Sequence, residues 1–458
     1  MVLSAASGAG HVRAADALVS AFAAAGRKAR HVEVLGYTNP LFRKIYADLY
    51  VELVNRRPHL LGMLYDALDR PWEFQKRRLA LDRLNTRPLV RLLKEENPSL
   101  AVCTHFLPAE ILAHLRRKKI LEVPIGVVVT DFDAHAMWLY RGVDWYFVAC
   151  EETKVHLSEL GIPQETIHVT GIPIDPAFSV QKPKREARLG LGLDPDRTTV
   201  LVSAGGFGVG PVDSLVRSLH QVSHPLQVVV ICGRNAPLAR RLSAFGEGTH
   251  PMRVVGYTTE MDAWMAASDL LVGKAGGLTS SEALARGLVM VIVNPIPGQE
   301  ERNSDHLLED GVAIRCNNLP ALAYKIDALL GDRDRYARMR KAASRAGRPD
   351  AARDVVTILS GSGTIPRGRA PVRNPLESVS ETPGTRRPGS PGTRMTRPVH
   401  LPDVLPADPG NGDGGEEDGA RPLRDDLRAR SSRSPLTGTS FSGAGGRGRS
   451  VFSAGYSG

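Results

Sequence analysis

Short apolar runs separated by segments of helical periodicity make up the first 360 residues. The runs are flanked by glycine, proline or polar residues and lie at 100–105, 125–132, 145–150, 198–203, 270–272 and 289–293. Alternation of short strands with helices is typical of parallel sheets whose two faces are covered by helices. The pattern predicts an α/β fold with doubly wound parallel sheets, followed by helices over 317–360 that pack back across the fold.

Two of the expected strands end in glycines that lead into a helix. Near the amino terminus, Val2 and Leu3 precede Gly8 and Gly10, and His11 stands where an Ala-rich helix begins. A side chain at such a junction projects toward the carboxyl edge of the sheet. His11 is therefore a candidate general base, with a purely structural histidine as the alternative.

The second junction follows the strand at 270–272. Gly276 and Gly277 end this strand, and a helix is expected to open at Thr279 or Ser280. The free N–H groups at a helix start favour an anion such as a diphosphate. The same letters, TSSE, also form a capping box, which would leave the glutamate with only a structural role.

Polar residues continue beyond that helix. A loop expected at 295–303 carries Gln299, Glu300 and Asn303, which suit the hydroxyls of a polyhydroxylated ligand, and Lys274 precedes the glycines. Ligands of open α/β sheets bind at the carboxyl ends of the strands. The crowding of these groups into one strand-helix-strand unit predicts a nucleotide-sugar site.

The segment TDFDAHAMW follows another expected strand end. Asp131 and Asp133 form an Asp-x-Asp pair, which in some nucleotide-sugar enzymes binds a metal ion that neutralises the diphosphate. A glycine-helix junction holds a diphosphate without metal, so the metal interpretation is set aside. Asp131 and His135 are expected to place the acceptor or support the base, with a structural turn as the alternative.

The composition changes after residue 360. Residues 361–458 are rich in Gly, Pro, Ser, Thr and Arg and lack apolar periodicity, which predicts a disordered tail. The preceding residues exceed what one hydrophobic core usually supports, so two domains are expected. Gly and Pro at 169–178 place the boundary between residues 1–170 and residues 171–360.

The chain is basic, with 59 Lys and Arg against 49 Asp and Glu. Basic residues interleaved with apolar ones between 41 and 120 suit an anionic lipid surface, although an ordinary solvated helical face fits as well. Nucleic acid is disfavoured because no recognition module is visible. Scattered cysteines and the lack of a spanning apolar segment predict a cytoplasmic protein, peripheral on the inner face of the cell membrane. The basic and apolar residues expected to contact the lipid surface include Arg56, Arg57, Leu60, Leu61, Trp72, Phe74, Arg77 and Arg78.

Three motifs resemble one known family. These are GKAGGLTSSEALARGLVMVIVNPIPGQEERN, TDFDAHAMW, and an SxxxGxGHxxAA pattern that runs from Ser4 to Ala15. They are similar to the monogalactosyldiacylglycerol synthases and bacterial processive diacylglycerol glucosyltransferases of glycosyltransferase family 28. The resemblance implies a GT-B fold of two facing Rossmann-like domains, the first for the acceptor and the second for the donor. It also implies inverting transfer of glucose or galactose from UDP-glucose or UDP-galactose to 1,2-diacylglycerol, with no cofactor or metal.

The resemblance also implies roles for individual residues. His11 would be the base, supported by Asp131 and His135, with Gly8 and Gly10 on the acceptor side. Glu282 would bind the ribose diol, and Gln299 and Glu300 the sugar hydroxyls. The implied donor set is Gly206, Phe207, Arg234, Val255, Tyr257, Lys274, Gly276, Gly277, Leu278, Thr279, Glu282, Gln299, Glu300 and Asn303.

Two alternatives remain open from the sequence. A related enzyme would transfer the sugar to another lipid, such as an undecaprenyl-linked intermediate. An inactive sugar-nucleotide-binding protein would instead act through the tail at 361–458.

Overall fold

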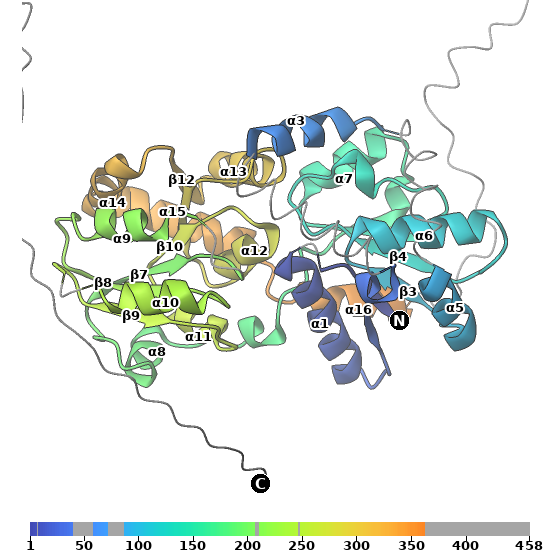
Figure 1. The fold of residues 1–458 in the computed structure, drawn as a ribbon, viewed down its shortest axis with the longest axis horizontal. Coiled ribbons are helices and arrows are strands. Elements are labelled where there is room, and N and C mark those ends of the chain that lie inside the picture. Colours follow the sequence, from blue (N-terminus) through green and yellow to red (C-terminus); the bar gives the residue numbers. More distant parts are fainter. Residues whose placement is uncertain (7, 40–57, 72–86, 207–209, 246–247, 362–458) are drawn as a thin grey trace, which may run out of the picture. The chain divides into compact units, whose positions relative to one another are not determined.

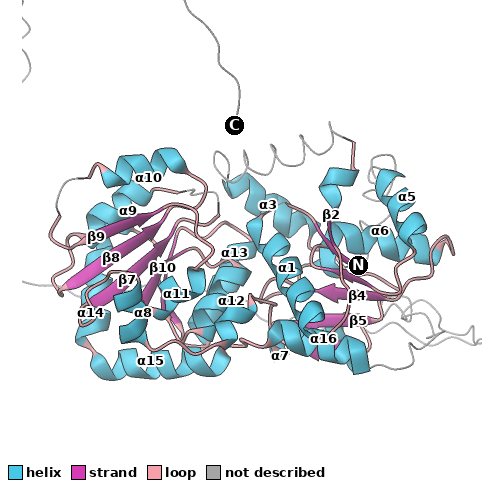
Figure 2. Ribbon diagram, turned by 90° about the horizontal axis from the view of Figure 1, so that it is seen from below, coloured by secondary structure: helices cyan, strands magenta, loops and turns pink. Residues whose placement is uncertain are grey.

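The computed structural model describes residues 1–6, 8–39, 58–71, 87–206, 210–245 and 248–361. Within these ranges the chain forms two sheets of six parallel strands with helices between the strands (Figures 1 and 2). The predicted α/β class with parallel sheets is confirmed. Several predictions fall outside the described residues, namely those on Phe207, Arg56, Arg57, Trp72, Phe74, Arg77, Arg78 and the tail after 361.

The first sheet has the strand order β2-β1-β3-β4-β5-β6. Two of its strands, β2 and β6, were not predicted, because each is short and contains polar residues, so that neither forms an apolar run. The strands are β1 (Val2–Ser4), β2 (His31–Glu33), β3 (Ala101–Cys103), β4 (Ile125–Val128), β5 (Trp145–Val148) and β6 (Ile167–Val169). The helices include α1 (Ala9–Ala24), α3 (Pro58–Leu68), α5 (Arg87–Glu96), α6 (Phe106–Arg117) and α7 (Glu151–Glu159).

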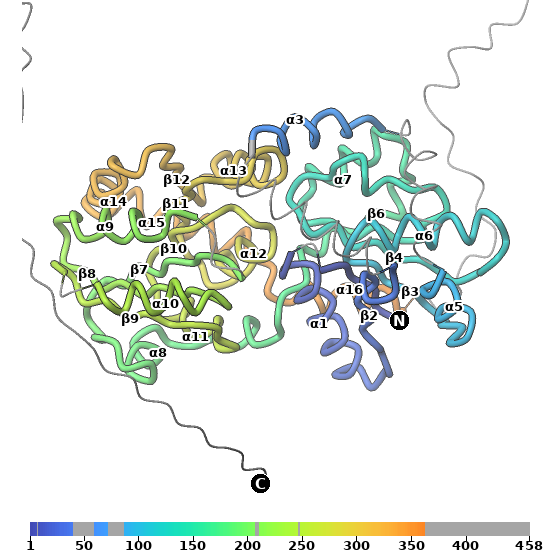
Figure 3. Tube along the Cα trace, viewed as in Figure 1, coloured from blue at the N-terminus to red at the C-terminus, as the bar shows by residue number. Residues whose placement is uncertain are grey.

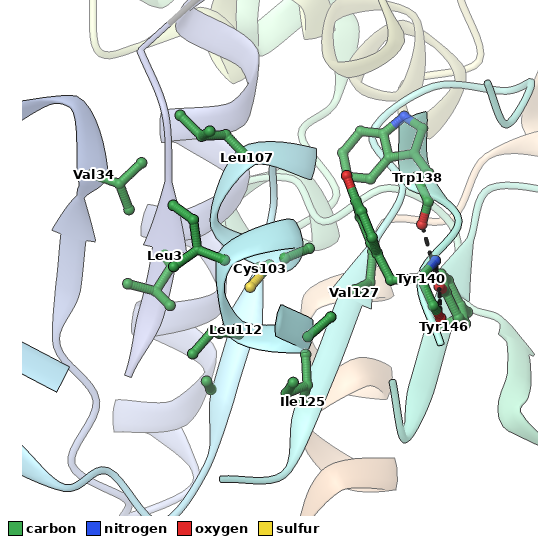
Figure 4. Packing of buried hydrophobic residues seen from close by; sticks show 14 of the residues in the cluster. Leu3, Val34, Cys103, Leu107, Leu112, Ile125, Val127, Trp138, Tyr140 and Tyr146 are labelled. Atoms are coloured by element: carbon green, nitrogen blue, oxygen red, sulfur yellow. Dashed lines mark hydrogen bonds between the residues drawn. The ribbon is translucent and has the colours of Figure 1, made fainter. Parts of the chain in front are cut away.

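The core of the first sheet is apolar, and the hydroxyl of Tyr146 is a buried polar group within it (Figure 4). Leu3 and Ile125 are fully buried there. The Tyr146 hydroxyl accepts from the Tyr140 N–H at 2.9 Å and lies 3.2 Å from the Trp138 carbonyl oxygen. This hydroxyl ties the loop after β4 to β5, and so fixes the path of the segment that carries Asp131.

The second sheet has the strand order β12-β11-β10-β7-β8-β9. Its strands are β7 (Thr198–Ser203), β8 (Leu226–Ile231), β9 (Met252–Val255), β10 (Leu270–Gly273), β11 (Val289–Val293) and β12 (Ala313–Cys316). Its helices are α8 (Lys184–Gly190), α9 (Val212–Leu219), α10 (Ala236–Ser243), α11 (Met261–Ala266), α12 (Gly277–Ala285), α13 (Gln299–Glu309), α14 (Leu322–Gly331) and α15 (Arg333–Ala346). The strands read as near-continuous apolar runs because helices cover both faces.

The last described helix, α16 (Ala351–Gly361), returns to the first sheet and packs along α1 (Figure 3). Its Val355 and Val356 share a hydrophobic cluster with Leu18 of α1 and Phe147 of β5. The helices after residue 317 therefore pack against both sheets, as the sequence predicted. The proposed boundary at residues 170 and 171 remains a prediction.

Each sheet contains one point where the strand order reverses. In the first sheet β1 lies between β2 and β3, and in the second β7 lies between β8 and β10. Crevices outside the carboxyl ends of strands at such switch points are the usual ligand sites of open α/β sheets. His11 follows β1, and Gly276 follows β10, so the predicted site residues lie at both switch points.

Candidate functional site

His11 is held at the first switch point by its Nδ1 atom. This atom lies 2.9 Å from the Thr104 carbonyl oxygen and 2.9 Å from the Thr130 hydroxyl. Because a carbonyl only accepts, Nδ1 carries the ring proton and Nε2 holds the lone pair. Burial of the ring lowers the pKa of His11 to about 4, so the imidazole is neutral near pH 7. The described residues give Nε2 no hydrogen-bond partner, and this nitrogen is free to accept a proton from a substrate.

Thr130 connects the base to the second sheet. A Cβ atom added at Gly277 would overlap the Thr130 carbonyl oxygen, so the start of α12 lies directly against the loop after β4. Only glycine permits this approach. A Cβ added at Gly206, after β7, would lie 3.0 Å from Ala9 of α1. The carboxyl edges of the two sheets therefore face each other, as the GT-B prediction required.

The start of α12 differs from the prediction. The helix begins at Gly277 with Gly276 as its N-cap, two residues before the expected Thr279. The capping box is consequently wrong: Glu282 is the sixth helical residue and lies beyond the reach of the cap. The earlier start puts Gly277 against Thr130, where only a glycine fits, and leaves the N–H groups of Gly277, Leu278 and Thr279 in the first turn without partners inside the helix.

The polar segment after β11 also differs from the prediction. Gln299, Glu300 and Asn303 belong to the first turns of helix α13 and not to a loop. A helix fixes their spacing, so that Gln299 and Asn303, four residues apart, share one face. Both of these residues donate to Asp131.

Asp131 is a buried carboxylate shared by both sheets. Gln299 Nε2 lies 2.8 Å from each of its oxygens, and Asn303 Nδ2 lies 3.1 Å from Oδ1. Burial raises the pKa of Asp131 to about 6, and these hydrogen bonds oppose the rise. Asn303 also accepts from the Phe132 N–H at 2.8 Å. Asp131 thus orients Gln299, the residue predicted to bind the sugar.

Glu282 is fully buried and forms an ion pair with Arg13 of α1. Burial raises the pKa of Glu282 to about 7, while Arg13 opposes the rise. Its second oxygen, Oε2, has no hydrogen-bond partner among the described residues, and neither has the buried Ser280 hydroxyl. A buried polar atom without a partner is rare in proteins and marks a position that a ligand can complete.

Glu300 and Lys274 lie together beside the glycines. The Glu300 carboxylate accepts from the Ile296 N–H at 2.7 Å. Burial raises the pKa of Glu300, and the positive charge of Lys274 opposes this. A Cβ added at Gly276 would lie 3.8 Å from Glu300 Oε1, which places this carboxylate beside the start of α12.

The residues predicted to surround the nucleobase lie at the ends of β8 and β9. The Arg234 guanidinium lies 5.2 Å from the centre of the Tyr257 ring, and that ring is 62% exposed. Val255 ends β9, and its carbonyl accepts from the Cys232 N–H at 2.8 Å. An exposed aromatic ring stacked on a cation is able to take a planar base, and this role remains a prediction.

His135 has a structural environment. Its Nε2 lies 2.8 Å from the Tyr65 carbonyl oxygen, and its Nδ1 accepts from the Met137 N–H at 3.0 Å. Both ring nitrogens thus hold main-chain groups. This geometry favours the turn alternative for His135, whose catalytic role remains a prediction. On the acceptor side, Gly8 is the N-cap of α1, and Gly10 packs against Leu278.

Three residues of the site were missed from the sequence, namely Arg13, Thr104 and Thr130. Thr104 and Thr130 each follow the end of a strand, β3 and β4, which is a usable signal in a parallel sheet. Arg13 carries no such signal, because its partner lies 269 positions away in the chain. Across the residues that the structure describes, no group of three or more His, Cys, Asp or Glu side chains is arranged to hold a metal ion. Metal independence stays a prediction.

Two Rossmann-like parallel sheets that face each other by their carboxyl edges define the GT-B glycosyltransferase architecture, and here a neutral histidine lies on one sheet and a glycine-started helix on the other. Two solved structures share this fold at a TM-score of 0.50. One is the S. aureus MnaA-UDP co-structure, 12% identical, which covers 78% of this chain and 95% of that one. The other is CalG4, the calicheamicin glycosyltransferase, 17% identical, which covers 79% and 98%.

Family models place the chain more closely. Residues 11–174 match the model described as Monogalactosyldiacylglycerol (MGDG) synthase, and residues 200–355 match the Glycosyltransferase family 28 C-terminal domain. The resemblance predicted from the motifs is confirmed. The chain is also 36% identical over 243 residues to processive diacylglycerol beta-glucosyltransferases of Staphylococcus aureus strains Newman and NCTC 8325. That match covers 53% of this chain and 61% of each relative.

Proposed function

We propose that the protein is an inverting glycosyltransferase that moves glucose or galactose from a UDP-sugar to the hydroxyl of 1,2-diacylglycerol. The family matches and the printed name of the Staphylococcus aureus relatives support this activity. No cofactor or metal is required in this proposal. The protein would work in the cytoplasm, at the inner face of the membrane that holds its lipid acceptor.

The observation that carries the proposal is the position of His11 opposite the start of α12. Thr130 contacts both, through its hydroxyl to His11 and through its carbonyl to Gly277. A diphosphate on the α12 N–H groups would leave its sugar beside Gln299 and Glu300, with the acceptor hydroxyl at His11 Nε2. Attack from the His11 side, opposite the departing UDP, inverts the anomeric carbon.

During the attack the neutral His11 imidazole takes the proton of the acceptor hydroxyl on Nε2, while the acceptor oxygen bonds to the anomeric carbon and the bond between that carbon and UDP breaks. The Nδ1 hydrogen bonds to Thr104 and Thr130 keep that lone pair available and stabilise the imidazolium that forms. The leaving UDP gains negative charge at the start of α12, where each N–H donor stabilises it by about 3 kcal/mol in a well-built site. Gln299, fixed by Asp131, orients the sugar for the attack.

Helix α3 supports the lipid side of the proposal. Leu60, Met63 and Leu64 are 47%, 70% and 45% exposed, and their spacing places them on one face of the helix. An exposed apolar helix face of this kind inserts into the interfacial region of a bilayer. The described residues contain no helix that is long and apolar enough to cross a membrane.

The test is a transfer assay with the full chain and vesicles that contain diacylglycerol. Radiolabelled UDP-glucose, UDP-galactose and UDP-N-acetylglucosamine are compared as donors, and NMR of the product reads the anomeric configuration. Lipid-linked hexose of inverted configuration is expected from one of the first two. Transfer only to an undecaprenyl-linked acceptor, or UDP binding without turnover, would replace the proposal by one of the two alternatives.

A further inference from the structure

Arg13 has an unusual position for the partner of a buried acid. It lies on α1, beside the first sheet, and pairs with Glu282 on α12, beside the second. The Arg13 side chain is 41% exposed, whereas that of Glu282 is 1% exposed. An exposed arginine is free to change its partner without unfolding its helix, because only its side chain has to rotate.

Only one of the two carboxylate oxygens of Glu282 has a hydrogen-bond partner among the described residues. Glu282 Oε1 accepts from Arg13, and Oε2 is buried with no partner in the described parts of the chain. If Arg13 were a purely structural counter-ion, a bidentate pair that used both oxygens would be the stable arrangement. The single contact leaves half of the carboxylate available for another donor, such as a hydroxyl.

A second anion site lies within reach of the same arginine. Helices α1 and α12 pack together, and Gly10 approaches Leu278 in the first turn of α12. Glu282 is five residues beyond Gly277, which is about 7.5 Å along the helix axis. An extended arginine side chain covers this distance, so Arg13 can point to Glu282 or to an anion at the start of α12.

We propose that Arg13 changes its partner when the donor binds. Its guanidinium moves from the Glu282 carboxylate to the diphosphate of the donor. This inference rests on the proposed function, in which the diphosphate lies at the start of α12 and Glu282 binds the ribose diol. In the empty enzyme Arg13 competes with the ribose for Glu282. In the complex its planar guanidinium binds two phosphate oxygens, and Glu282 accepts the ribose hydroxyls through both of its oxygens.

The exchange predicts opposite effects on two ligands. Uridine has the ribose but no phosphate, so it meets only the competition from Arg13. Arg13→Ala removes that competition, and the affinity for uridine is expected to rise by about tenfold if Arg13 occupies Glu282 nine-tenths of the time. In Arg13→Ala, UDP is also freed from the competition for Glu282, but it loses the charge-assisted contact between Arg13 and its diphosphate. The ratio of UDP affinity to uridine affinity is therefore expected to fall by about tenfold or more.

Calorimetric titration of uridine and UDP into the full chain tests the exchange, with Arg13→Ala and Arg13→Lys as variants and Arg27→Ala as control. Arg27 is exposed just after α1 and should leave both affinities unchanged. Arg13→Lys keeps a charge without the planar fork and is expected to fall between wild type and Arg13→Ala. Melting temperatures confirm that each variant is folded.

The result that overturns the inference is an unchanged UDP-to-uridine ratio in folded Arg13→Ala and Arg13→Lys. A parallel loss of both affinities also overturns it, because Arg13 would then only hold Glu282 in place. Failure of the proposed function looks different: wild type would not bind UDP, or would bind it without transferring a sugar in the vesicle assay. Wild-type UDP binding with equal affinities in every variant refutes the exchange alone.

Discussion

The two buried carboxylates of the site, Asp131 and Glu282, are held in contrasting ways. Asp131 accepts hydrogen bonds on both oxygens from Gln299 and also from Asn303. Glu282 accepts one, from Arg13, and its other oxygen has no partner among the described residues. Both acids contact an element of the other sheet, so their location alone does not account for the difference.

This difference indicates which part of the site is complete before a ligand arrives. On the first side, protein groups hold both oxygens of Asp131 and the Nδ1 atom of His11, and His11 Nε2 has no hydrogen-bond partner in the described parts of the chain. The side of Glu282 and Ser280 contains buried atoms without partners in the described chain. Under the proposed function, we therefore expect the His11 side to be preformed and a bound donor to complete the Glu282 side.

The largest expected effect comes from removing the fixed base. His11→Ala should lower transfer by about 100- to 10,000-fold, which is the usual contribution of general base catalysis. UDP affinity should stay near that of wild type, because His11 acts on the acceptor. His224→Ala, which removes a partly exposed histidine beside α14, is the matched control. Transfer within a few fold of wild type would exclude His11 as the base.

The next largest effect is expected at Gly277, where the start of α12 lies against the loop after β4. Gly277→Ala places a methyl group on the Thr130 carbonyl oxygen, and a backbone atom cannot move aside as a side chain does. A loss of about 2 to 3 kcal/mol in the free energy of unfolding is expected from overpacking. Gly190→Ala, whose added Cβ meets no atom within 4 Å, is the control and should be neutral. Chemical denaturation measures both, and equal stabilities would show that the sheets do not meet at this point.

The pH dependence of transfer separates Asp131 from His11. Asp131 must be ionised to accept from Gln299 and Asn303, and its pKa is raised to about 6, so activity should fall as the pH drops through 6. The pKa of His11 is about 4, too low to set this limb. Stability runs the other way. Because the pKa of Asp131 in the folded protein exceeds its ordinary value, protonation of Asp131 stabilises the fold. This contribution to the free energy of unfolding is fully present below pH 4 and is lost as the pH rises through 6.

A pH-rate profile of wild type and Asp131→Asn is the measurement. The variant should lose the limb near pH 6 as well as part of its activity. A limb that persists at the same pH in Asp131→Asn belongs to another group and removes Asp131 from the role of orienting Gln299.

The smallest effect on stability is expected at Glu282, whose Oε2 atom has no partner in the described chain. Because the pKa of Glu282 is raised to about 7, the carboxyl is close to half protonated near neutral pH, and Glu282→Gln changes little in the folded protein. The free energy of unfolding should change by less than about 1 kcal/mol, within the range of substitutions that leave packing intact. UDP affinity should fall by about five- to tenfold through the lost ribose contact. Unchanged UDP affinity with a lowered melting temperature would make Glu282 a structural residue.

The class of fold was predictable from the amino-acid pattern, and so was the placement of His11, Asp131 and Gly276 after the ends of strands. Apolar runs separated by helical periodicity specify parallel strands, since a strand covered on both faces has no polar side. The glycine junctions at Gly8 and Gly276 could be predicted because each lies between an apolar strand and a helix that are adjacent in the sequence. Residues that follow strand ends, such as His11 and Asp131, were found because parallel strands bring their carboxyl ends to one edge.

Tertiary structure alone decided how these residues are paired. The start of α12 at Gly277 lies against the carbonyl of Thr130, 147 positions earlier in the chain, and no local cap signal encodes that contact. The helical form of Gln299 to Asn303, their hydrogen bonds to Asp131, and the Arg13–Glu282 pair likewise join the two sheets. Hydrophobic periodicity records which face of an element is buried. It carries no record of which distant polar group will lie opposite, and that is settled only when the two carboxyl edges meet.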